Sequence, residues 1–128
     1  MKKAIISIGL AGLWISISEF IRNEFLFKSY WVSHYEALGL KFETAPVNGV
    51  LWLVWSMVLA GVVYALLKKF SFREALAIAW VMAFVLMWIT VFNLQVLPLG
   101  LLIFAVPLSL IEVVVAGVII KKLTFENK

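Results

Sequence analysis

The sequence predicts an all-α, polytopic membrane protein with four transmembrane helices in one compact bundle. Hydrophobic residues make up 65% of the chain and charged residues 14%, and the mean hydropathy of +1.09 lies far above the range of soluble domains. The apolar residues gather in four runs, each near the roughly 20 residues that a helix needs to cross a bilayer. Because four such runs use most of the 128 residues, we expect a single membrane domain over 1–128.

Charge and composition exclude several classes of function. The net charge of +4 does not indicate a nucleic-acid partner, because the basic residues stand in short clusters beside apolar runs, where they anchor topology. The chain has no cysteine and one histidine, His34, which excludes disulfides, thiol redox chemistry, iron–sulfur clusters, bis-histidine haem and a histidine-based zinc site. We therefore expect no cofactor and no metal.

The first span is expected over residues 4–21, after Met1, Lys2 and Lys3. A charged start and a cleavage-like end at Ser16-Ile17-Ser18 also resemble a signal peptide, but the apolar run is long enough to span a bilayer, and we favour a retained helix. Small residues recur along it at helical spacing, so that this face can approach another helix closely: Ser7, Ala11, Gly12 and Ser16.

Residues 25–45 form the longest polar connection, but this segment is too aromatic for a free loop. Four apolar positions recur at steps of 4, 3 and 4, which predicts an interfacial helix with one aromatic face: Trp31, Tyr35, Leu38 and Phe42. His34 beside Glu36 could bind a metal or move a proton, but a lone imidazole is more often a hydrogen-bonding residue.

The second and third spans are expected over 47–67 and 74–96. Ser71 and Glu74 have the Ser-x-x-Glu spacing of a capping box, in which the hydroxyl accepts from a backbone amide and the carboxylate reaches back. We therefore expect the third helix to begin there. Alanines repeat along it every four residues, which suits close helix packing: Ala75, Ala79 and Ala83.

The fourth span is expected over 101–120, after a tight turn at Pro98 and Gly100, with a modest bend at Pro107. It carries one acid, Glu112. A carboxylate at a helix centre costs roughly 2.5–3.5 kcal/mol, and each Leu, Ile, Val or Phe returns about 0.3–0.6 kcal/mol. The fourteen such residues in this run can therefore carry Glu112 into the bilayer.

Glu112 is the centre of the first candidate site, because acids inside a membrane segment are functional-site hypotheses by default. With about 1.5 Å of rise per residue, it lies at a depth similar to that of polar residues in the other helices. The expected proton or substrate site comprises Glu112, Ser56, Ser16 and Ser109. No expected span offers an interior Lys or Arg, so we expect a neutral Glu112, and a purely structural hydrogen bond explains it equally well.

A second candidate site is a polar rim at the outer ends of the first three helices, for which a solvated surface is the favoured interpretation. Its members are Glu19, Arg22, Asn48, Asn93 and Gln95.

Lysine and arginine placement sets the orientation. Arg22, Lys28 and Lys41 fall on one side of the four expected spans. By the positive-inside rule the opposite side, with eight basic residues, is cytoplasmic, so both termini are expected inside the cell (inner) membrane. The eight are Lys2, Lys3, Lys68, Lys69, Arg73, Lys121, Lys122 and Lys128.

The layout of LLKKFSFREALAIAW between two spans and PLGLLIFAVPLSLIEVVVAGVIIKK at the end resembles small four-helix proteins of the bacterial inner membrane. The chain also looks superficially like the small multidrug-resistance transporters, which have four helices and a membrane-embedded glutamate in the first. Here Glu19 stands at the end of the first helix and the deep acid, Glu112, is in the fourth. That family's site is therefore not carried over.

Three functions remain open. The favoured one is a protein that acts through packing, as a homo-oligomer or with a partner, with membrane lipids as its surroundings and no catalytic residue. The chain could instead be a proton-coupled carrier that uses Glu112 for a small molecule of unknown identity. Less favoured is an enzyme acting on lipid head groups at the outer surface, with Glu19, His34 or Glu36 as acid or base.

Overall fold

The computed structural model describes residues 1–126, and 84% of the chain is helical, with no strand in that part. Four helical stretches are long and apolar enough to cross a membrane, which confirms the expected helix content and the expected number of candidate spans. They are Lys2–Leu26, Pro46–Leu67, Phe72–Asn93 and Leu99–Phe125. Lys128, one of the expected anchors, lies outside the described residues.

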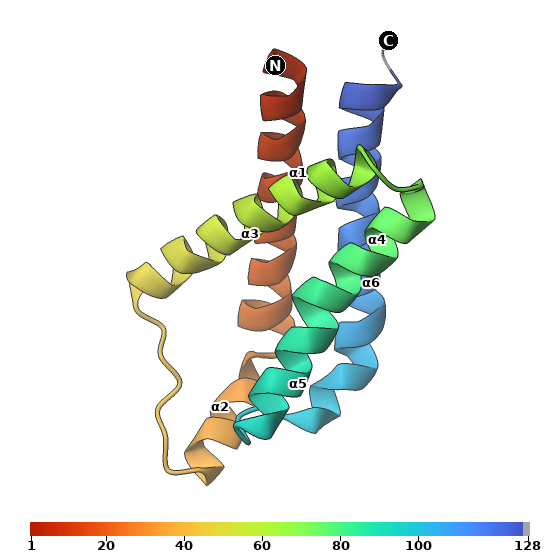
Figure 1. Ribbon diagram of the computed structural model, residues 1–128. Coiled ribbons are helices and arrows are strands. Elements are labelled where there is room, and N and C mark those ends of the chain that lie inside the picture. The colour runs from red at the N-terminus through yellow and green to blue at the C-terminus, as the bar shows by residue number, and fades with distance from the viewer. Residues whose placement is uncertain (127–128) are drawn as a thin grey trace.

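Three of the long stretches contain a π-helical turn. The remaining one, Pro46–Leu67 (α3), is a continuous α-helix (Figure 1). The first stretch reaches Leu26, five residues beyond its expected end, and the third ends at Asn93 because Gln95 takes a positive φ of 62°. In order, the elements are α1 (Lys2–Phe20) with a π-helical turn (Ile21–Leu26), α2 (Lys28–Ala37), α3 (Pro46–Leu67), α4 (Phe72–Trp80), a π-helical turn (Val81–Val85), α5 (Leu86–Asn93), a 3-10 turn (Leu99–Leu101), α6 (Leu102–Ile120) and a last π-helical turn (Lys121–Phe125).

Helices α1 and α6 run antiparallel, side by side, and α3 lies obliquely across α1 (Figure 1). Ser7 Oγ lies 2.7 Å from Thr124 Oγ1 at one end of the α1–α6 pair, and Trp14 Nε1 donates to the Glu112 carbonyl, 3.0 Å away, nearer the middle. Gly12 marks the close approach of α3, because a Cβ there would collide with Met57 Sδ. Helices α3 and α6 therefore both pack on the small-residue face expected on the first helix.

The start of α4 follows from its local sequence. Ser71 N donates to Glu74 Oε2 at 3.0 Å, and Glu74 N donates to Ser71 Oγ at 3.5 Å, which confirms the capping box. Ala75 and Ala79 are fully buried, and α4 packs on α6 where Gly117 faces Leu76. Small residues thus let these helices approach closely.

The aromatic connection differs from expectation. Helix α2 ends at Ala37 and does not continue to Phe42, because Gly39 adopts a left-handed φ of 70°. The chain then turns back, and Phe42 stacks on Trp31 with ring centroids 6.2 Å apart and meets Tyr35 edge-on at 5.3 Å. The aromatic group exists, but a reversal of the backbone brings it together, whereas the sequence predicted a single helical face.

The ends richest in lysine and arginine gather on one side. The start of α1 and the end of the last π-helical turn lie at the same end of the molecule, and the α3–α4 connection lies toward it (Figure 1). The Lys121 ammonium lies 5.3 Å from the centre of the Phe72 ring, and Tyr64 stacks on Phe125 with centroids 5.8 Å apart. Pro107 lies inside α6 without ending it.

Candidate functional site

Three charged side chains meet in the interior between α1 and α6: Glu19, Arg22 and Glu112, which we call the charge cluster. Their exposed fractions are 3%, 6% and 0%. Arg22 NH2 donates to Glu19 Oε1, and Arg22 NH1 lies 3.2 Å from Glu112 Oε2. With both carboxylates ionised, two negative charges and one positive charge leave the cluster with a net charge of −1.

Local sequence explains how the cluster forms. Glu19 and Arg22 are three residues apart, so they lie on one helical face, and the antiparallel α6 brings Glu112 beside them. Arg22 belongs to the π-helical turn after α1, and its guanidinium carbon lies 5.3 Å from the ring centre of Phe84, in the π-helical turn between α4 and α5. Such turns are rare and are frequently found at functional sites.

Uncharged polar groups surround the cluster. Ser18 Oγ donates to Glu112 Oε2 at 2.8 Å, and Asn23 Nδ2 donates to Glu19 Oε2 at 2.9 Å. Trp31 Nε1 in turn donates to Asn23 Oδ1 at 3.1 Å. Within residues 1–126, two buried side-chain nitrogen or oxygen atoms have no hydrogen-bond partner, and both belong to the cluster: Arg22 NH1, which has only its ion-pair contact, and Glu112 Oε1.

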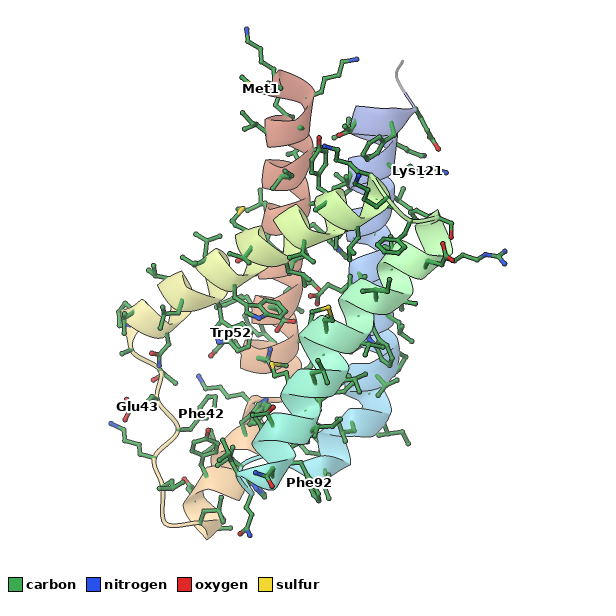
Figure 2. All side chains as sticks on the ribbon, viewed as in Figure 1. Met1, Phe42, Glu43, Trp52, Phe92 and Lys121 are labelled. Atoms are coloured by element: carbon green, nitrogen blue, oxygen red, sulfur yellow. The ribbon has the colours of Figure 1, made fainter. Side chains whose placement is uncertain are left out.

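A cavity of about 870 Å³ adjoins the cluster and meets it at Glu19 and Arg22. Glu112 is not among the lining residues. Figure 2 shows Trp52 on α3 and Phe42 on the connection between α2 and α3, which both contribute to the wall. The remaining wall comes from α1 and its π-helical turn, α2, the start of α3 and the α5–α6 region: among others Ser16, Asn23, Phe27, Lys28, Tyr35, Lys41, Glu43, Pro46, Asn48, Met87, Trp88, Leu101 and Ala105.

None of the three serines expected around Glu112 makes a hydrogen bond to its side chain within the described residues, although Ser109 is buried one turn away on the same helix. Ser16 lines the cavity, whereas Ser56 is buried and donates to the Trp52 carbonyl at 2.8 Å. Ser109 accepts from Trp80 Nε1 at 2.9 Å and donates to the Val106 carbonyl. The serine that does bond to Glu112 is Ser18, which the sequence does not single out because depth counted along upright helices does not show which side chains are lateral neighbours.

The residues expected at the outer rim separate into two groups. Glu19 and Arg22 share the large cavity with Asn48. Asn93 and Gln95 instead line a second cavity of about 510 Å³ with His34, whose Nε2 lies 2.8 Å from the Gln95 carbonyl oxygen.

Arg22 corrects two expectations. It is buried, not part of a solvated rim, and it supplies the cation near Glu112 that the expected spans did not contain. The reason is that the first helical stretch continues past residue 21 to Leu26, so Arg22 stays inside the helix packing and faces α6.

The fold and the site define an all-helical chain with four candidate membrane spans and a buried charge cluster beside a cavity. Comparisons with protein-family models, curated proteins and solved structures found no match.

Proposed function

We propose that this chain is an integral protein of the cell inner membrane, a single bundle of four spans with both termini in the cytoplasm, and that it is a proton-coupled carrier of a small molecule. The observation that supports a carrier is the cavity of about 870 Å³ that ends at Glu19 and Arg22, the two residues that join Glu112 in the charge cluster.

Surface chemistry supports the membrane assignment. Large apolar side chains are exposed along all four long helical stretches, a distribution that suits contact with lipid. Examples, in chain order, are Ile6, Leu13, Ile17, Val50, Val54, Val58, Met82, Leu86, Ile89, Ile103, Leu110 and Ile111.

The charge balance supports proton coupling. A net charge of −1 in a buried site is costly, and a proton on either acid makes the cluster neutral. The groups that face Arg22 are Glu19 on α1, Glu112 on α6 and the uncharged ring of Phe84. A ligand that contacts Arg22 or Glu19 from the cavity changes this balance and therefore changes how tightly the cluster holds its proton.

The two competing hypotheses predict different geometry or behaviour. A protein that acts only through packing or partners needs the cluster for stability alone, and neutral substitutions would leave its activity unchanged. An enzyme at the outer surface would need an acid beside His34. The residues that line the His34 cavity include amides and apolar side chains but no carboxylate.

The test uses protein reconstituted in vesicles with a trapped pH-sensitive dye and an imposed pH gradient. A panel of small organic anions and cations is added, and proton movement is recorded for wild type, Glu112→Gln and, as a control at the opposite end of the molecule, Lys69→Gln. We expect at least one compound to move protons with wild type and Lys69→Gln but not with Glu112→Gln. Identical traces for all three proteins would refute the carrier.

Orientation is tested separately by labelling single introduced cysteines. The chain has no native cysteine that would react in their place. Single cysteines at Lys2 and Lys69 should react only with reagents on the cytoplasmic side, and one at Ser33 only with reagents outside. Labelling of Lys69→Cys from outside would reverse the topology.

A further inference from the structure

Asn23 joins the charge cluster to the aromatic wall of the cavity. Its Nδ2 donates to the Glu19 carbonyl at 3.1 Å and to Glu19 Oε2 at 2.9 Å, and its Oδ1 accepts from Trp31 Nε1 at 3.1 Å. An indole N–H can only donate, so the amide oxygen must face Trp31 and the amide nitrogen must face Glu19. Asn23 is therefore held in one orientation by partners at both ends.

The two acids of the cluster receive hydrogen bonds unequally. Glu19 has a donor on each carboxylate oxygen, because Arg22 NH2 bonds to Oε1 and Asn23 Nδ2 bonds to Oε2. Glu112 has its contacts with Ser18 and with Arg22 NH1 on Oε2 alone, and its Oε1 has no hydrogen-bond partner. Hydrogen bonds to a carboxylate favour the ionised form, and an unpaired buried oxygen disfavours it. This arrangement favours an ionised Glu19 and a proton on Glu112.

The other charges near the cluster do not change this preference. Lys28 and Glu24 line the cavity as a pair of their own, 2.8 Å apart, and Lys41 and Glu43 are exposed lining residues of opposite charge. Helices α1, α3 and α4 pack on α6. Within the described residues, α3 and α4 carry titratable side chains only toward the lysine-rich end of the molecule: Tyr64, Arg73 and Glu74. Among these groups, Arg22 is therefore the cation that faces both acids.

The cavity reaches Glu19 and its donor but not Glu112. Glu19, Asn23 and Trp31 line the cavity, whereas Glu112 does not. Trp31 is held from its other side by Phe42 of the α2–α3 connection, which stacks on the indole with ring centroids 6.2 Å apart. A ligand that displaces Trp31 breaks its bond to Asn23 and so loosens the donor on Glu19.

We propose that Asn23 is a positioning residue that keeps Glu19 ionised and so places the proton of the charge cluster on Glu112, and that Trp31 makes this placement depend on what occupies the cavity. When Asn23 turns away, Glu19 Oε2 loses its donor and the proton passes from Glu112 to Glu19. One O–H bond breaks and one forms, while Arg22 stays charged. The proton then lies on the acid that lines the cavity. This inference rests on the proposed function for the role of the proton.

The experiment measures the placement of the proton and needs no transported compound. All seven acidic residues of the chain are glutamates, so protein labelled with an NMR-active carbon at the glutamate carboxyl gives few signals, and their shifts distinguish neutral from ionised groups. The protein is studied in micelles at neutral pH, and the two signals are assigned by their loss in Glu19→Gln and Glu112→Gln.

Three variants are compared with wild type: Asn23→Leu, Trp31→Phe and Trp80→Phe. Trp31→Phe keeps a ring for Phe42 to stack on and removes only the N–H donor. Trp80→Phe is the matched control, because it removes an indole hydrogen bond of 2.9 Å to Ser109, on the same helix as Glu112 but outside the cluster.

We expect a neutral Glu112 and an ionised Glu19 in wild type. Asn23→Leu should shift the ratio of the two proton placements about tenfold or more toward Glu19, because a hydrogen bond to a charged group is lost, and the two signals then move toward each other. Trp31→Phe should shift the ratio in the same direction by about twofold to tenfold. Trp80→Phe should leave both signals in place.

A neutral Glu19 in wild type, or two ionised carboxyl groups, would overturn the proposal. Signals that Trp31→Phe does not move, or moves no more than Trp80→Phe does, would also overturn it, and this comparison decides the matter if Asn23→Leu fails to fold. The carrier is judged separately. The expected shifts in a protein that moves no protons in vesicles would refute the carrier and leave the proton placement standing, whereas proton movement with unresponsive signals would refute the role of Asn23 alone.

Discussion

The charge cluster makes a prediction about asymmetry, namely that removing its single cation destabilises the protein far more than removing one of its two acids. Arg22→Met preserves much of the side-chain volume but leaves Glu19 and Glu112 buried without a positive charge. Breaking a buried ion pair by deleting one partner costs about 3–5 kcal/mol. Glu112→Gln removes the contact of 3.2 Å to Arg22 but leaves Arg22 bonded to Glu19, and the new amide oxygen can still accept from Ser18.

The second substitution should therefore cost about 1 kcal/mol or less, the value of one ordinary hydrogen bond. The difference between the two variants is then at least about 2 kcal/mol. A triple variant, Glu19→Gln, Arg22→Met and Glu112→Gln, removes every charge and should recover most of the loss, because neutral replacement of a whole buried ion cluster is often near neutral in free energy.

The assay is reversible unfolding in mixed micelles of maltoside and dodecyl sulfate, followed by circular dichroism, with the free energy of unfolding compared among wild type and the three variants. Equal losses for Arg22→Met and Glu112→Gln would refute the view that the cluster depends on its single cation more than on either acid. A triple variant less stable than Arg22→Met alone would do the same.

Two further predictions concern packing and capping. Gly12→Leu should lower the free energy of unfolding by about 1–3 kcal/mol, because the new side chain would collide with Met57. The control is Gly9→Leu, which gains the same helix propensity at a position with open space. Equal effects of the two substitutions would disprove the α1–α3 contact. Ser71→Ala should lower the free energy of unfolding by about 1 kcal/mol, because it removes the N-terminal cap of α4. The control is Arg73→Ala at an exposed neighbouring position, which should change stability by less than about 0.5 kcal/mol. A similar loss in both variants would show that the cap does not stabilise α4.

The sequence predicted those features that depend on local pattern. The four apolar runs follow from composition and the capping box at Ser71 follows from residue spacing, and both appear in the structure. Burial of Glu112 also follows from sequence, because the run around it is otherwise apolar. These features require no knowledge of which helices touch.

The partners of Glu112 could not be obtained in the same way. Depth counted at a fixed rise per residue assumes upright helices that start at one level, but α3 lies obliquely across α1, so Ser56 does not bond to Glu112. The end of the apolar run before Arg22 predicts a surface position for it, yet the helix continues through a π-helical turn. A spacing of three between Glu19 and Arg22 was the available signal, and it indicated a pair without showing that the pair faces inward.

The composition of the cluster separates stability from activity. A buried arginine is balanced by one carboxylate, and Glu19 already provides that partner within the same helical stretch. Glu112 is therefore a surplus acid, which a purely structural ion pair does not require and which must hold a proton or a cation to make the site neutral. For this reason Glu112→Gln is expected to leave the fold nearly unchanged while it removes the surplus acid and leaves a neutral Glu19–Arg22 pair, so a stable but inactive variant is the outcome that the carrier requires.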